Sequence, residues 1–111
     1  MKVIDLVNQL GLHVFSAGEL LESEVTGGYV SDLLSDVIGH AREGVVWVTL
    51  QTHPNIVAVA SLKDLAAIIL VKGLNPEEET IRLAEREKVI VLGTQLSAFE
   101  VSGMLYNLLK A

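Results

Sequence analysis

Five residues could bind a small ligand, because each stands near the end of a run of apolar residues that is expected to form a strand. They are Thr52, His53, Lys72, Gly73 and Thr94. In an open parallel sheet, ligands bind at the carboxyl ends of the strands, and the free N–H groups of a nearby helix N-terminus favour an anion. Lys72 would supply positive charge, and the threonines would offer hydroxyl groups. The alternative is that Gly73 only lets a strand turn into a helix.

Thr26, Gly27 and Gly28 form a second candidate loop, which precedes a predicted helix. A glycine-rich loop in this position could cradle a phosphate, although it matches neither the Walker A nor the dinucleotide-binding pattern. A turn that requires a positive φ is the simpler explanation for the glycines. These residues are therefore the second place to look for a ligand.

The three histidines, His13, His40 and His53, are far apart in the sequence and lack the spacing of a metal-binding helix. Only His53 lies in a candidate ligand loop. No histidine is placed to activate a serine as a nucleophile. These residues indicate binding rather than catalysis, and the alternative is a small enzyme or enzyme subunit that uses the Thr52/His53 loop.

The composition excludes several classes of protein. The chain of 111 residues has no cysteine, which removes thiol catalysis and the usual ligands of an iron–sulfur cluster. A net charge of −6 disfavours nucleic acid as a partner. The longest apolar run, residues 65–71, is too short to cross a membrane, and an acid at position 5 argues against an export signal. We expect a single cytoplasmic domain over residues 1–111.

Hydrophobic patterning predicts that strands and helices alternate. Residues 12–15 are a candidate strand, and three segments are apolar on both faces, which is typical of strands inside a parallel sheet. These segments are residues 45–50, 65–71 and 89–92. Residues 3–10 have helical spacing, and residues 55–62 are predicted to be a largely buried crossover helix. The fold class is α/β, a three-layer domain with a mainly parallel central sheet and helices on both faces.

Capping residues indicate where three further helices begin. Ser31 is expected to cap a helix, and Asn75 is expected to cap another that has Pro76 at its first position. Ser97 and Glu100 form a capping box before the final helix. The buried stripe of the Ser31 helix is predicted to contain Leu34, Val37, Ile38 and Ala41.

Three segments of the chain, residues 25–37, 51–60 and 93–101, resemble small stand-alone DRTGG-domain proteins. The implied fold is similar to the N-terminal domain of HPr kinase/phosphorylase. The family name describes an Asp-Arg pair and a Thr-Gly-Gly, and the positions that match them here hold Thr52-His53 and Val71-Lys72-Gly73. Only the last glycine of the name motif is retained.

The resemblance implies a regulatory role. Related domains lie beside CBS domains in pyrophosphatases, which implies regulation by an adenine nucleotide and a dimer. Small members are often labelled iron–sulfur binding hydrogenase or serine kinase and lie near hydrogenase genes, which implies a hydrogenase-related partner. Without cysteine or a P-loop lysine, we expect neither a cluster nor kinase activity on this chain.

The sequence therefore predicts a non-catalytic regulatory or ligand-sensing domain, with an adenine nucleotide as the candidate ligand. Half of the residues are apolar, and a domain of this size has little interior in which to bury them. Part of the apolar surplus is expected on a partner surface, so we also predict a homodimer.

Overall fold

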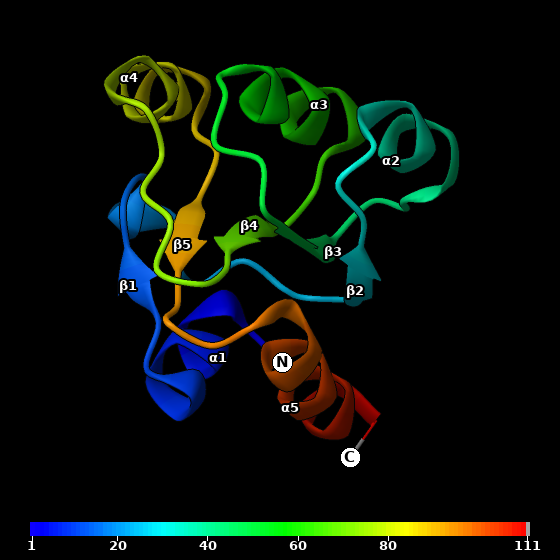
Figure 1. Ribbon diagram of the computed structural model, residues 1–111. Coiled ribbons are helices and arrows are strands. Elements are labelled where there is room, and N and C mark those ends of the chain that lie inside the picture. Colours follow the sequence, from blue (N-terminus) through cyan, green and yellow to red (C-terminus); the bar gives the residue numbers. More distant parts are fainter. Residues whose placement is uncertain (111) are drawn as a thin grey trace.

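A five-stranded sheet forms the centre of the molecule (Figure 1). The computed structural model describes residues 1–110. The spatial order of the strands is β1-β5-β4-β3-β2, in which β2 to β5 are parallel and β1 pairs with β5 in the antiparallel sense. The strands are β1 (His13–Val14), β2 (Gly27–Val30), β3 (Val45–Thr49), β4 (Ala67–Leu70) and β5 (Val91–Gly93).

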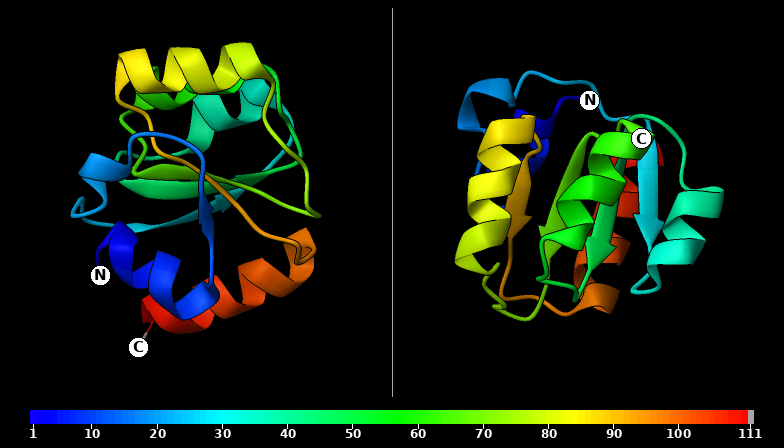
Figure 2. Two further views of the ribbon diagram at one scale, coloured as in Figure 1. Left: turned by 90° about the vertical axis from the view of Figure 1, so that its left-hand side faces the viewer. Right: turned by 90° about the horizontal axis from the view of Figure 1, so that it is seen from above.

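Helices cover both faces of this sheet, which confirms the predicted α/β class with three layers. Helices α1 (Val3–Leu10) and α5 (Ala98–Lys110) lie on one face. Helices α2 (Leu34–His40), α3 (Asn55–Lys63) and α4 (Glu78–Glu87) lie side by side on the other face (Figure 2). A short 3-10 helix, η1 (Gly18–Leu20), follows β1.

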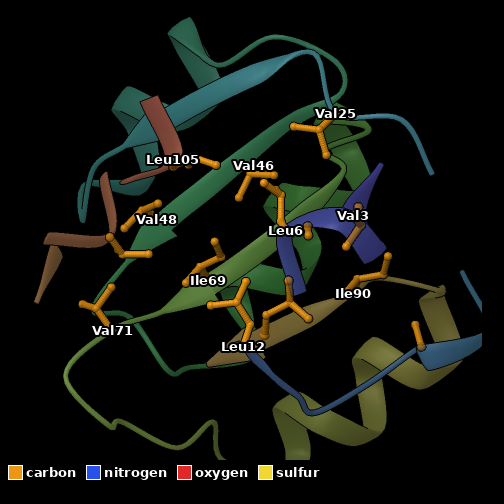
Figure 3. Packing of buried hydrophobic residues seen from close by; sticks show 14 residues of the cluster. Val3, Leu6, Leu12, Val25, Val46, Val48, Ile69, Val71, Ile90 and Leu105 are labelled. Carbon is orange, nitrogen blue, oxygen red and sulfur yellow. The ribbon is translucent and has the colours of Figure 1, made fainter. Parts of the chain in front are cut away.

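The inner strands are apolar because both of their faces are covered. All residues of β3 are buried, and the side chains alternate between two cores. Val46 and Val48 join the core against α1 and α5, which also contains Leu6 and Leu105 (Figure 3). Trp47 belongs to the core on the opposite side of the sheet. The uninterrupted apolar runs in the sequence thus identified these strands correctly.

Several local predictions are confirmed. Helix α1 ends at Gly11, which adopts the left-handed conformation with a φ of 65°. The predicted crossover helix is α3, and four of its residues are buried. The capping box before α5 forms as predicted, since the Ser97 N–H donates to Glu100 Oε1 at 3.1 Å and the Glu100 N–H donates to Ser97 Oγ at 3.2 Å.

Two predicted helix starts are wrong. The Ser31 N–H still donates to Val48 O, so the chain remains beside β3 and α2 begins only at Leu34. Ile38, which was assigned to the buried stripe, is 41% exposed. Asn75 does not cap α4, because the Glu77 N–H is bonded to Thr52 O and Glu77 has an extended backbone, so that this helix begins at Glu78.

The predicted turn at Thr26, Gly27 and Gly28 is also wrong. Gly27 and Gly28 lie in β2, and neither has a positive φ. Gly28 instead gives space to a neighbour, since a Cβ there would lie 3.2 Å from Leu105 Cδ2 on α5. No helix among residues 1–110 is long and apolar enough to span a membrane.

Candidate functional site

A pocket of about 320 Å³ opens at the carboxyl ends of β4 and β5, beside the start of β1. We call it the strand-end pocket. Parallel strands place their carboxyl ends on one edge of the sheet, which is where ligands bind in this class of fold. The pocket is lined by Gly11, His13, Phe15, Gly73, Leu74, Asn75, Gly93, Thr94 and Gln95.

Two loops meet at one side of this pocket. The Lys72 N–H donates to Leu96 O and the Gly73 N–H donates to Thr94 O, both at 2.8 Å. Gly73 has a φ of +70°, and a Cβ at this position would lie 2.5 Å from Gln95 Oε1. The glycine is required both by the backbone angle and by the close approach of the Gln95 amide.

An aromatic pair forms the opposite side. A Cβ on Gly93 would lie 2.5 Å from Phe15 Cε2, so the Phe15 ring lies directly over this glycine. The His13 ring meets the Phe15 ring edge to face, with 4.5 Å between the ring centroids and 72° between the planes. The pocket therefore offers aromatic groups against which a planar ligand could stack.

The electrostatics of the pocket differ from those of the whole chain. The protein carries a net charge of −6, yet no aspartate or glutamate is among the residues that line the pocket. Its polar groups are neutral amides, a hydroxyl and an imidazole, and they come from Asn75, Gln95, Thr94 and His13. Lys72, whose side chain is exposed, neighbours the lining residue Gly73. This arrangement can bind a planar, hydrogen-bonding ligand that carries negative charge.

The structure brings together only part of the predicted set of site residues. Gly73 and Thr94 line the strand-end pocket, and Lys72 is adjacent. Thr52 lies in the loop between β3 and α3 and contacts the first turn of α4, where its carbonyl accepts the Thr80 hydroxyl at 2.7 Å. His53 is exposed and its Nδ1 accepts the Asn55 N–H at 3.1 Å, so it caps the first turn of α3.

The prediction that free N–H groups of helix N-termini surround this site needs correction. The Lys72 and Gly73 N–H groups donate to carbonyls of the loop after β5, and the Thr94 N–H donates to Leu70 O at the end of β4. Helix α4 begins eight residues after Leu70 and carries Glu78 and Glu79 in its first turn, which repel an anion. At α5, Ser97 and Glu100 occupy the terminal N–H groups. Side chains rather than helix ends line the pocket.

Sequence reasoning missed three lining residues that carry aromatic or polar side chains: His13, Phe15 and Asn75. His13 and Phe15 lie about 80 residues before Thr94, and they reach the pocket because β1 pairs with β5. Nothing in the local sequence indicates that antiparallel pairing. Asn75 lies two residues beyond Gly73 and could have been included by extending that predicted loop.

Two aspartates near the β2 edge of the sheet, Asp32 and Asp36, accept hydrogen bonds from neighbouring strand residues. Asp32 Oδ1 accepts the Thr49 hydroxyl at 2.8 Å and the Leu50 N–H at 2.7 Å. The Tyr29 hydroxyl donates to Asp36 Oδ2 at 2.8 Å. This hydrogen bond lowers the pKa of the Asp36 carboxyl and raises the pKa of the Tyr29 hydroxyl, because it favours the charged carboxylate and the protonated phenol. These acids have structural partners.

A second depression of about 450 Å³ lies between β2 and α5, and we call it the edge groove. It contains Gly27 and Gly28 of the second candidate loop, now part of a strand. Apart from Lys110, its lining carries no charged side chain. The lining residues are Gly27, Gly28, Val30, Ser102, Leu105, Tyr106, Leu109 and Lys110. Within residues 1–110, no group of three or more His, Cys, Asp or Glu residues could hold a metal ion.

The fold and the pocket at its strand ends define an α/β domain with a mostly parallel sheet. Residues 5–108 match the family profile of the DRTGG domain, so the chain belongs to the DRTGG domain family. Among proteins of curated function, none matches the sequence.

One solved structure is similar over 93% of this chain, with a TM-score of 0.71 and 16% identity. It is the regulatory region of a Clostridium perfringens pyrophosphatase, which contains CBS and DRTGG domains and is in complex with its activator, diadenosine tetraphosphate. The chain spans 45% of the length of that structure, so the two share a fold over one part of the larger protein.

Proposed function

We propose that this protein is a non-catalytic regulatory domain that binds an adenine nucleotide in the strand-end pocket. The observation that carries the proposal is the pocket itself. An aromatic wall, neutral amides and an adjacent lysine converge at the strand ends, without a carboxylate in the lining, in a chain of net charge −6. An adenine ring would stack against Phe15 and His13, and its phosphates would extend toward Lys72.

The comparison supports this ligand class. The structurally similar pyrophosphatase region is regulatory and has an adenine dinucleotide as its activator. In the present chain, His53 is bonded to the backbone of α3, and the Thr94 hydroxyl oxygen of the pocket accepts the Leu96 N–H at 3.2 Å rather than bonding with His13. This supports a binding role over the alternative of a small enzyme that uses the Thr52/His53 loop. Association with a hydrogenase-related protein remains part of the proposal, on the resemblance given above.

Thermal unfolding in the presence of nucleotides tests the proposal. AMP, ADP, ATP and diadenosine tetraphosphate are added separately, with adenosine as the uncharged comparison. A ligand at 100 times its dissociation constant stabilises the folded state by about 2.7 kcal/mol. For a domain of this size, the melting temperature is expected to rise by roughly several degrees. Titration calorimetry then gives the dissociation constant.

Two exposed histidines provide matched variants. His13→Ala removes a lining group and is expected to weaken binding by about tenfold, the effect of one modest contact. His53→Ala removes a side chain of the same type outside the pocket, and it should leave the dissociation constant unchanged. Absence of a shift with any nucleotide at millimolar concentration contradicts the proposal. Equal weakening by both variants would place the ligand elsewhere.

A further inference from the structure

The two edges of the sheet differ in their protection. An exposed edge strand offers free N–H and C=O groups for pairing, and proteins usually shorten or charge such edges. At one edge, β1 has only two residues. At the other, β2 has four residues, and Gly27 to Val30 include neither a charged side chain nor a proline. The β2 edge therefore carries neither the charge nor the proline that commonly prevents pairing with another strand.

The hydrogen bonds of β2 show which groups are free to pair. The Ser31 N–H donates to Val48 O, so residues 27, 29 and 31 bond with β3 in the parallel ladder. The backbone groups of Gly28 and Val30 alternate with these and point away from the sheet. The side chain of Val30 is 53% exposed and lines the edge groove beside Gly28.

We propose that β2 pairs with β2 of a second copy of this chain, antiparallel about a two-fold axis at Tyr29. In this register, Gly28 of each copy exchanges both backbone hydrogen bonds with Val30 of the other. Directly opposite residues share one face of the sheet, so each Val30 side chain lies over the Gly28 of its partner. It thereby enters the edge groove, where Gly28 leaves space beside Leu105. The strand is complementary to itself.

Helix α5 continues the same surface. Phe99 is 90% exposed and Tyr106 is 68% exposed, and their spacing of seven residues places them on one side of the helix, the side that includes Ser102 of the groove. The two-fold axis sets the two α5 helices antiparallel. Lys110, at the end of this stripe, then lies beside Phe99 of the other copy and far from the other Lys110. The interface therefore opposes no like charges at Lys110, whose ammonium group lies 5.7 Å from the ring centroid of Tyr106 in its own chain.

The mass in solution gives the first test. Light scattering and sedimentation at micromolar concentration are expected to report about twice 12.0 kDa. Val30→Lys places charge in the groove and should raise the dimer dissociation constant by at least about thirtyfold, as for a central interface residue. Leu62→Lys is the control, because Leu62 is 69% exposed on α3, away from this edge. A monomer across the whole dilution series, or equal dissociation by both variants, overturns the proposal.

Cysteine cross-linking tests the register itself, since the native chain has no cysteine. Tyr29→Cys places two Cα atoms about 4.5 Å apart across the two-fold axis, within the range that a disulfide bridges. Val30→Cys places its two Cα atoms about 9 Å apart, which is too far. We expect a disulfide-linked dimer from Tyr29→Cys alone under mild oxidation, with circular dichroism confirming that both variants fold. Linkage of Val30→Cys as fast as that of Tyr29→Cys overturns this register.

Discussion

The strand-end pocket and the edge groove both depend on glycine, but for different physical reasons. At Gly73 the backbone has a φ of +70°, and a Cβ would meet Gln95. At Gly28 the backbone is an ordinary strand, and the missing Cβ makes room beside Leu105. The first glycine shapes a loop, whereas the second leaves a hollow in a sheet edge. Similar glycine patterns in a sequence can thus form two unlike surfaces.

The two surfaces also differ in polarity. The strand-end pocket joins amides and a hydroxyl to an aromatic wall, which suits a polar and planar small molecule. The edge groove is mostly apolar and lies along a strand with free backbone groups, which suits another polypeptide. The proposed ligand site and the proposed dimer interface therefore lie on separate parts of the molecule. Variants can therefore change one without the other.

Gly93→Ala is expected to have the largest effect on stability. The new methyl group would lie 2.5 Å from Phe15 Cε2 in the wall of the strand-end pocket, so the ring must move. Overpacking of this kind costs about 1–3 kcal/mol of unfolding free energy. Chemical denaturation measures the loss, and dimerisation of the folded protein should persist. Gly103→Ala is the control, because a Cβ there meets nothing within 4 Å, and alanine favours the helix. An equal loss in both variants would contradict this explanation.

Gly73→Ala and Gly28→Ala form the next pair. Gly73→Ala forces an alanine into the left-handed region and should cost about 1–2 kcal/mol of unfolding free energy. Gly28→Ala gains chain stiffness in the strand but brings a Cβ to 3.2 Å from Leu105, so the net change should be within about 0.5 kcal/mol. Denaturation under dilute, monomeric conditions compares them. A larger loss for Gly28→Ala would mean that the new contact with Leu105 costs more unfolding free energy than the left-handed backbone angle at residue 73.

The smallest predicted effect concerns acid. The Tyr29 hydroxyl is the main cause of the lowered pKa of Asp36, with contributions from Ser31 and His40. A carboxyl whose pKa is lower in the folded state stabilises the fold above its unfolded pKa of about 3.9, and this stabilisation disappears as the pH falls through the folded value. Tyr29→Phe should therefore be less stable than the native protein at neutral pH, and the difference should shrink below about pH 4. A difference that is constant with pH would show that the hydroxyl does not act through Asp36.

Much of the fold was predictable from the sequence because its signals are local. The inner strands are continuous apolar runs, Gly11 terminates a helix, and Ser97 with Glu100 begins another. The errors occur where a tertiary hydrogen bond outweighs local preference. Ser31 remains bonded to β3, and Glu77 is held by Thr52 O, so each of the following helices begins later than its capping residues suggest.

The residues of the strand-end pocket likewise divide into those that local sequence signals predicted and those that depend on tertiary contacts. The sequence by itself determined the strand-end loops with Gly73 and Thr94, because the ends of parallel strands must gather at one edge of the sheet. Only the tertiary structure decided that Phe15 and His13 form the wall of the pocket, since β1 pairs with β5 across a separation of almost 80 residues. It also decided that Gly28 faces α5 from an open sheet edge. Strand order depends on contacts between distant segments, and residue types within one segment do not specify it.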